Sequence, residues 1–227
     1  MSASRWSDLL PRVLSGLVMV AVGLGAVWMG GAWFHGLIAM VCGLMIWELV
    51  CMLDTGRTRS QYILGAATVL ALILAVGIPP GFALPLLLLP SMLGFSRMQT
   101  GGVIYGVFSA LILLAGYGLM MLRDDLGLVW MLWLVLVVVG TDIAGYFAGR
   151  MIGGPKLWPR VSPKKTWSGA TAGWAASALI GWIFLSLTGA NAGLVGISIA
   201  VSMASQLGDI AESAVKRRYG VKDSSGL

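Results

Sequence analysis

Long apolar stretches and short polar stretches alternate along the whole chain. Several apolar stretches reach the roughly 20 residues that an α-helix needs to cross the hydrocarbon core of a bilayer. The pattern predicts an all-α fold, a polytopic integral-membrane helical bundle with about eight transmembrane helices. The expected helices occupy residues 13–34, 37–53, 61–78, 82–95, 103–122, 128–149, 168–187 and 193–215.

The residues between these helices predict the turns. We expect a Gly-rich hairpin at 30–36, a tight polar turn at Arg123-Asp124-Asp125 and a long polar loop at 150–167. The first apolar run is long for the hydrophobic part of a signal peptide and passes straight into the next run, so we interpret it as a spanning helix. The fourth helix is short and contains Pro85 and Pro90, which predicts a kinked or re-entrant segment.

Composition agrees with a membrane protein. Hydrophobic residues make up 58% of the chain and charged residues only 11%, whereas soluble domains average about 25% charged. The 32 glycines suit close packing of membrane helices. Cys42 and Cys51 have no nearby Cys or His partner, so we expect them to pack in the core rather than bind a metal or form a disulfide. His35 is assigned no chemistry.

The basic residues orient the predicted bundle. With an inner N-terminus and eight crossings, Arg123 is the only basic residue in the outer segments, which is a strong positive-inside bias. We therefore expect the active face to be cytoplasmic, at a bacterial inner membrane, and to attract anionic head groups and nucleotides. Nucleic acid is a poor alternative, because no soluble basic domain is present to bind it. The inner segments hold Arg5, Arg12, Arg57, Arg59, Arg97, Arg150, Lys156, Arg160, Lys164, Lys165, Lys216, Arg217, Arg218 and Lys222.

Four carboxylates lie inside apolar segments, where each charge costs about 2.5–3.5 kcal/mol on insertion scales. They are Glu48, Asp142, Asp209 and Glu212. All four fall in helix halves near the cytoplasm, so we expect them to line one polar cavity open to the cytosol. Asp209 and Glu212 share a helix face because they are three residues apart. The alternative is that some of them only join helices or anchor them at the interface.

The stretch Ser162-Pro-Lys-Lys-Thr-Trp-Ser-Gly169 is the second informative region. Hydroxyl and ammonium groups precede a helix N-terminus there, which suits binding of a polyphosphate. The alternative is an ordinary positively charged loop with Trp158 and Trp167 at the membrane interface.

Three motifs follow one another in the second half of the chain: Asp142-Ile-Ala-Gly-Tyr-Phe-Ala-Gly-Arg150, Ser162–Gly169, and Ser205-x-x-Gly-Asp-x-x-Glu-Ser-x-x-Lys-Arg217 with Lys222-Asp223-Ser224. In order and composition they resemble the signature of one enzyme family, the phosphatidate cytidylyltransferases (CDP-diacylglycerol synthases). The resemblance covers roughly residue 142 to the end, and the N-terminal half matches only in being hydrophobic. It implies one membrane domain with a scaffold at 1–127 and the catalytic motifs at 128–227.

The resemblance implies an integral-membrane enzyme of phospholipid biosynthesis. Such an enzyme condenses CTP with phosphatidate, with Mg²⁺, to give CDP-diacylglycerol and pyrophosphate. The family signature continues past Lys-Asp-Ser into Pro-Gly-His-Gly-Gly and an Asp-Arg-x-x-Asp motif, whereas the given sequence stops at Leu227. Two interpretations follow: either the given sequence is truncated inside the motif, which is the preferred one, or the chain is inactive alone.

The chemistry gives each site residue a hypothetical role. Phosphatidate brings its own phosphate nucleophile, so a metal held by carboxylates and surrounded by cations is sufficient. Asp209 is assigned to the metal, and Asp142 and Glu212 are further ligands or lie beside the ligands. The catalytic set is Asp209, Asp142, Glu212 and Lys216. The substrate-binding set is Ser162, Lys164, Lys165 and Thr166, with Arg217, Lys222 and Asp223, and with Arg150 on the lipid phosphate.

Three other functions stay open. A CTP-dependent lipid-alcohol kinase would use similar groups and is distinguished by its product. A small membrane transporter would place carboxylates in a cavity, but the inverted repeats typical of transporters are not found in the sequence. A non-catalytic membrane scaffold is the third. Acyl-chain preference, metal count and assembly as a monomer or homodimer are also left open.

Overall fold

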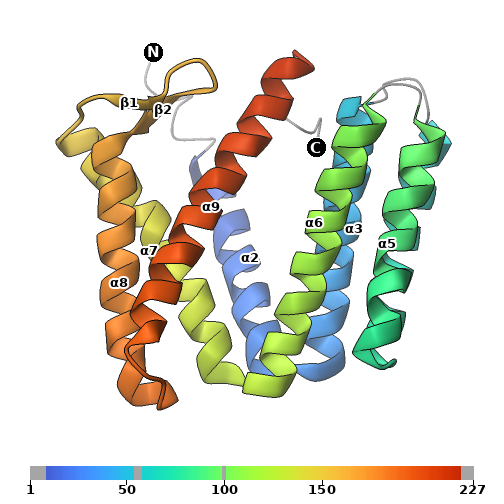
Figure 1. The fold of residues 1–227 in the computed structure, drawn as a ribbon, viewed down its shortest axis with the longest axis horizontal. Coiled ribbons are helices and arrows are strands. Elements are labelled where there is room, and N and C mark those ends of the chain that lie inside the picture. The colour runs from blue at the N-terminus through green and yellow to red at the C-terminus, as the bar shows by residue number, and fades with distance from the viewer. Residues whose placement is uncertain (1–8, 54–57, 99–100, 221–227) are drawn as a thin grey trace. The chain divides into compact units, whose positions relative to one another are not determined.

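The computed structural model describes residues 9–53, 58–98 and 101–220. These residues form eight α-helices, one π-helical turn and one two-stranded hairpin (Figure 1). The predicted all-α class is confirmed, with the hairpin as an addition. The elements are α2 (Leu9–Met29), α3 (Gly31–Leu53), α4 (Thr58–Val76), α5 (Pro80–Arg97), α6 (Gly102–Met121), η1 (Leu122–Leu126), α7 (Leu128–Met151), β1 (Lys156–Trp158), β2 (Ser162–Thr166), α8 (Trp167–Thr188) and α9 (Gly193–Arg218).

Most of these helices can cross a membrane. Within the described residues, six are long and apolar enough to do so, and α2 contributes a shorter apolar stretch, Val13–Met29. The chain is therefore an integral membrane protein. Pro85 and Pro90 lie inside α5, which runs as one helix from Pro80 to Arg97. The six candidate spans are Gly31–Leu53, Arg59–Val76, Gly102–Leu126, Leu128–Met151, Trp167–Thr188 and Gly193–Arg218.

The first turn is shorter than the sequence predicts. The chain leaves α2 at Met29 and enters α3 at Gly31, so the expected hairpin over 30–36 is wrong in its length. Gly30 and Gly31 have φ of 65° and 49°, values that glycine adopts without steric cost. Two such residues are enough to reverse the chain, and the apolar residues that follow join α3.

The chain divides into two compact units, which we describe separately. The first unit consists of Met1–Trp47 and Arg59–Leu128. Its core is built from α3, α4, α5 and α6, and it includes the buried thiol of Cys42. Tyr105 of α6 fits against Gly94 of α5 and donates a hydrogen bond of 3.2 Å to the Pro90 carbonyl. This bond ties α6 to the middle of the proline-containing helix.

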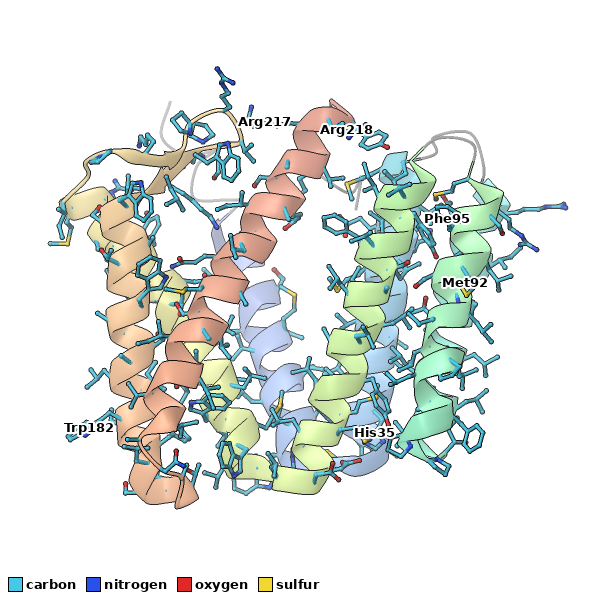
Figure 2. The ribbon with its side chains drawn as sticks, viewed as in Figure 1. His35, Met92, Phe95, Trp182, Arg217 and Arg218 are labelled. Carbon is cyan, nitrogen blue, oxygen red and sulfur yellow. The ribbon has the colours of Figure 1, made fainter. Side chains whose placement is uncertain are left out.

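The expected tight turn at Arg123 is instead the π-helical turn η1, which continues α6. Its Arg123 guanidinium donates to the carbonyls of Val27 and Trp28, at 2.8 Å and 3.2 Å. Carbonyls in the last turn of a helix lack partners within the helix, so Arg123 caps the C-terminus of α2. Asp124 lies 2.8 Å from His35, which Figure 2 labels on α3.

The second unit consists of Glu48–Thr58 and Val129–Leu227. In it α8 and α9 run antiparallel side by side, joined by a short loop (Figure 1). Apolar side chains of α7, α8 and α9 pack together around Trp133. Two buried hydrogen bonds also join α7 to α9, Trp133 to Ser198 at 3.0 Å and Thr141 to Ser202 at 2.8 Å. Hydrogen bonds of this kind hold membrane helices in register.

The stretch predicted as a long polar loop contains the hairpin. Its strands pair antiparallel, with Lys156 opposite Thr166 and Trp158 opposite Ser162. Gly153 and Gly154, with φ of 67° and 97°, turn the chain away from the end of α7. The hairpin lies over the end of the unit where α7 ends and α8 begins (Figure 1).

Candidate active site

A cavity of about 390 Å³ opens in the second unit, between α7, the hairpin, α8 and α9. Its volume falls within the range of small-molecule binding sites, roughly 300–1,000 Å³. The cavity brings together side chains from residue 141 to residue 209 that are far apart in sequence. Among the predicted site residues, the cavity is lined by Asp142, Arg150, Lys164, Lys165, Thr166 and Asp209.

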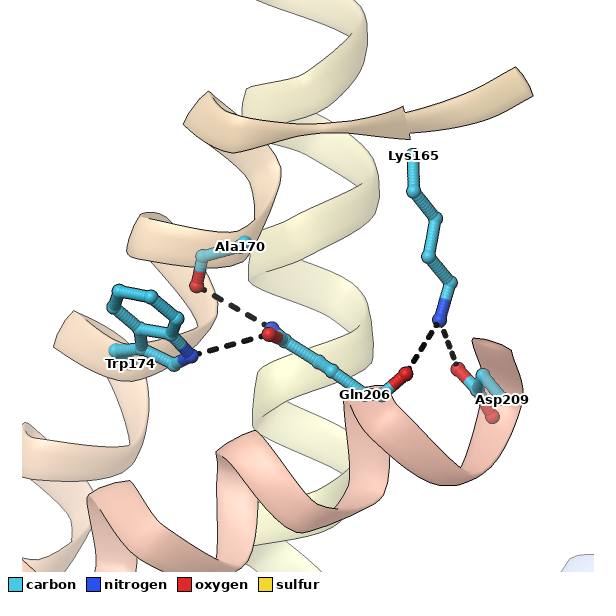
Figure 3. A network of polar contacts seen from close by, with 5 residues as sticks. All are labelled: Lys165, Ala170, Trp174, Gln206 and Asp209. Carbon is cyan, nitrogen blue, oxygen red and sulfur yellow. Dashed lines mark hydrogen bonds and ion pairs between the residues drawn. The ribbon is translucent and has the colours of Figure 1, made fainter. Parts of the chain in front are cut away.

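Lys165 and Asp209 form the main charged contact of the cavity (Figure 3). The Lys165 ammonium donates to the Asp209 carboxylate at 2.7 Å and to the Gln206 carbonyl at 3.4 Å. The side chains of Lys165 and Asp209 are 28% and 51% exposed, so both can be reached from the cavity. Asp142 of α7 lines the same cavity as Lys165 and Asp209. One cavity therefore holds a lysine of the hairpin and carboxylates of two different helices.

Glycines let α7 and α8 touch at the cavity wall. A Cβ on Gly169 of α8 would lie 2.6 Å from the carbonyl oxygen of Gly145 of α7. A Cβ on Gly149 would lie 2.9 Å from the Thr166 hydroxyl. No side chain fits at these points, so the two helix backbones are in direct contact. This contact places the Asp142 face of α7 next to the start of α8.

The Thr166 side chain caps the N-terminus of α8. Its hydroxyl accepts a 3.2 Å hydrogen bond from the Gly169 N–H, which makes it the N-cap of α8. The side chain is only 4% exposed. Ser168 lies 3.0 Å from the same hydroxyl and donates to the Gly153 carbonyl. The predicted phosphate-binding stretch thus presents its lysines to the cavity, while the Thr166 hydroxyl is engaged in capping.

Arg150 is held at the end of α7 by its own helix. Its guanidinium donates to the Tyr146 hydroxyl at 3.0 Å, and both residues line the cavity. Guanidinium has five N–H donors in a planar fork that fits phosphate, and this contact uses one of them.

Several predicted residues lie elsewhere. Glu212 pairs with Lys216 one turn further along α9, and neither lines the cavity. Arg217 donates from Nε to the Val161 carbonyl at 2.6 Å, which ties the end of α9 to the hairpin turn (Figure 2). Ser162 belongs to β2 and does not line the cavity either. Lys222 and Asp223 are outside the described residues.

The expectation that four carboxylates line one cavity is wrong for two of them. Asp142 and Asp209 line it, whereas Glu48 and Glu212 do not. For Glu212 the reason is helix geometry, because three residues advance a helix by about 4.5 Å. That rise carries its carboxylate past the cavity to Lys216.

Gln206 is a cavity residue that the sequence reasoning missed. Its amide bonds to Trp174 and to the Ala170 carbonyl of α8 (Figure 3). The available signal was a single amide side chain in a helix otherwise rich in small and apolar residues. That signal could mark the position but could not identify its partners.

The donor set suits a cation brought in with a polyphosphate. Among the described residues no group of three or more His, Cys, Asp or Glu side chains could hold a metal ion. Mg²⁺ is usually bound by one or two carboxylates together with substrate phosphates and water. The two carboxylates of the cavity, Asp142 and Asp209, fit that pattern.

Comparison with known proteins shows which family the chain belongs to. A sequence profile of the cytidylyltransferase family matches residues 10–227. The chain is 37% identical over 235 residues to the phosphatidate cytidylyltransferase of Brucella suis biovar 1 (strain 1330), which covers 97% of the chain and 84% of that protein. It is also 37% identical over 107 residues to the phosphatidate cytidylyltransferase of Bacillus subtilis (strain 168), covering 46% of the chain and 40% of that protein. The chain belongs to the cytidylyltransferase family, and the resemblance drawn from its three motifs is confirmed.

Proposed function

We propose that this protein transfers the cytidylyl group of CTP to phosphatidate, giving CDP-diacylglycerol and pyrophosphate for phospholipid biosynthesis. The observation that carries the proposal is the cavity in which Asp142, Asp209 and Lys165 meet. It lies within the stretch that carries the three family motifs. The first-named relative, which is aligned with 97% of the chain, is a phosphatidate cytidylyltransferase.

The reaction needs no nucleophile from the protein. A phosphate oxygen of phosphatidate attacks the α-phosphorus of CTP and forms a new P–O bond. The bond from the α-phosphorus to the oxygen that bridges to the β-phosphorus breaks, and the electron pair leaves with pyrophosphate. The protein must bring two anions together and stabilise the charge that develops on the phosphates, which is mainly a task of positioning and electrostatics.

The residues of the cavity divide this task. Asp209 and Asp142 would hold Mg²⁺, which when bound neutralises charge on the triphosphate. Lys165 and Lys164 bind the phosphates of the nucleotide. Arg150 binds the phosphate of the lipid through its remaining N–H donors.

Residues around the cavity have supporting roles in the proposal. Glu212 and Lys216 pair with each other on the next turn of α9 and set the charge beside Asp209. Arg217 holds the hairpin through the Val161 carbonyl. Ser162, Lys222 and Asp223 keep the substrate-binding role that the resemblance implies.

The proposed active face is cytoplasmic, and the proposed membrane is the bacterial inner membrane. The support is the charge of the loops, because the hairpin and the end of α9 carry most of the lysines and arginines of the second unit. CTP then arrives from the cytosol. Ile143, Phe147 and Met151 are exposed on α7 close to the cavity residues Tyr146 and Arg150. Such a surface suits a lipid that approaches from within the bilayer.

The test is an assay of lipid products with labelled CTP, phosphatidate and the purified protein. We expect a nucleotide-linked lipid, formed only with Mg²⁺, and a loss of turnover of at least about 100-fold in Asp209→Asn. Asp125→Asn, which makes the same change in η1 of the other unit, is the matched control. Wild-type turnover by Asp209→Asn would overturn the metal assignment. A monophosphorylated lipid as product would establish the kinase instead.

A further inference from the structure

Gln206 connects three elements around the cavity. Its side-chain oxygen accepts a hydrogen bond of 3.1 Å from the Trp174 indole N–H. Its side-chain nitrogen donates to the Ala170 carbonyl at 3.3 Å. Its backbone carbonyl accepts from the Lys165 ammonium at 3.4 Å (Figure 3). One residue of α9 thus contacts α8 twice and β2 once.

The two side-chain bonds fix the amide in one orientation. An indole N–H can only donate and a backbone carbonyl can only accept, so the amide oxygen must face Trp174 and the nitrogen must face Ala170. Gly173 leaves the space for this arrangement, because a Cβ there would lie 2.7 Å from the amide nitrogen. The amide therefore fixes the position of α9 along the axis of α8.

This attachment sits directly beside the charged contact of the cavity. Asp209 follows Gln206 by three residues and shares its helix face. The Lys165 ammonium donates to the backbone carbonyl of Gln206 and to the carboxylate of Asp209. A shift of this turn of α9 would move both acceptors of Lys165 together.

We propose that Gln206 is a positioning residue for the nucleotide. Its amide holds α9 against α8, so that Lys165 and Asp209 meet the triphosphate and its cation at a fixed separation. The inference rests on the proposed function and adds to it a residue that acts through Lys165 and Asp209.

The test compares kinetic constants in the cytidylyl-transfer assay. Gln206→Leu keeps a side chain of similar size but removes both bonds to α8. Two lost hydrogen bonds predict a KM for CTP raised roughly tenfold. The KM for phosphatidate is expected to stay within about twofold, because Arg150 is on α7 and is held by Tyr146. Trp174→Phe removes only one of the two bonds, so a smaller rise of the same kind is expected.

Ser198→Ala is the matched control. It removes another hydrogen bond between an indole and α9, donated by Trp133 at 3.0 Å and fully buried. Ser198 does not line the cavity. The control should lower the melting temperature and leave the KM for CTP unchanged.

A double-mutant cycle completes the test. Because Gln206 acts partly through Lys165, the rise in KM caused by Gln206→Leu should be clearly smaller when Lys165→Ala is already present. The proposal would be overturned if the two rises in KM for CTP multiplied fully in the double mutant. It would also be overturned if Gln206→Leu, like Ser198→Ala, lowered the melting temperature and left the KM for CTP unchanged. If Gln206→Leu does not fold, an unchanged KM for CTP in Trp174→Phe would overturn it. A wild-type protein that forms no nucleotide-linked lipid would overturn the proposed function itself.

Discussion

The Lys165 ammonium lies 2.7 Å from the carboxylate of Asp209, a residue 44 positions away in the sequence. Both side chains are partly exposed, and exposed ion pairs contribute little to stability, typically 0–1 kcal/mol. The pair is therefore better explained by binding than by folding. Under the proposed function, an approaching polyphosphate would compete with Asp209 for the ammonium, and a divalent cation would compete with Lys165 for the carboxylate.

Removing the ammonium should weaken nucleotide binding far more than it weakens the fold. For Lys165→Ala we expect a KM for CTP raised about 10- to 100-fold, because hydrogen bonds to charged groups contribute about 1.5–3 kcal/mol. Adding Lys164→Ala should raise it further. Steady-state kinetics at saturating phosphatidate measure the effect. Lys156→Ala makes the same change in charge in the same hairpin at a position that does not line the cavity, and an equal rise there would refute a specific role.

The cation requirement should change when the second carboxylate is neutralised. Asp142→Asn removes one of the two acidic ligands, so the Mg²⁺ concentration for half-maximal activity should rise roughly tenfold, in line with loss of one charged interaction. A Mg²⁺ titration of initial rates at fixed CTP measures it. Removal of divalent cations by a chelator should abolish turnover in both proteins. An unchanged Mg²⁺ dependence would restrict the cation to Asp209.

The contact between helix backbones predicts a steric effect. Gly169→Ala places a Cβ 2.6 Å from the Gly145 carbonyl, and overpacking of this kind costs about 1–3 kcal/mol. A chain of this size should lose about 2–4 °C in melting temperature for each kcal/mol. Gly196→Ala is the control, because a Cβ on that glycine of α9 would meet nothing within 4 Å. Equal melting temperatures for the two variants would show that α7 and α8 can separate freely.

The N-cap of α8 gives a separate stability prediction. Thr166→Val keeps the shape of the side chain and removes the acceptor of the Gly169 N–H, so it should cost about 1 kcal/mol. Thr166→Ser retains the acceptor and should stay close to the wild type. Thermal unfolding in detergent compares the three proteins. If Val and Ser at this position gave the same melting temperature, the hydroxyl would not be acting as a cap.

Arg123 predicts a further effect on stability in the first unit. Arg123→Met keeps the length of the side chain but leaves the Val27 and Trp28 carbonyls without their donor, at a cost of roughly 1–3 kcal/mol. Arg123→Lys has a single ammonium group and should fall between the wild type and Arg123→Met. The order of melting temperatures checks this prediction.

The sequence predicts the helices well because each is a long apolar run, and length and hydropathy are local properties. The hairpin is different. Its strands are only three and five residues long, one contains Pro163, and neither has an alternating apolar pattern. Only pairing between the two strands defines them, so the sequence alone indicated a loop.

The site could be predicted only in part, for a similar reason. Asp142 and Asp209 stand out because charge is rare in apolar segments, and Lys165 stands out because it precedes a helix N-terminus among other cationic and hydroxyl groups. The partners of Gln206 and Arg217 cannot be inferred in this way, because they are an indole and backbone carbonyls brought close by the fold. The sequence indicated a phosphate ligand at Arg217, which stays a prediction, and the structure adds that its Nε donates to the hairpin turn.

The contact between Gly145 and Gly169 determines how the cavity can respond to what it binds. The lining also includes partly exposed side chains, such as those of Lys165 and Asp209, whose rotation can change its shape. Where the two main chains touch, the cavity could be enlarged only if whole helices moved apart. This part of the wall is therefore rigid and limits the shape of the molecules that can bind.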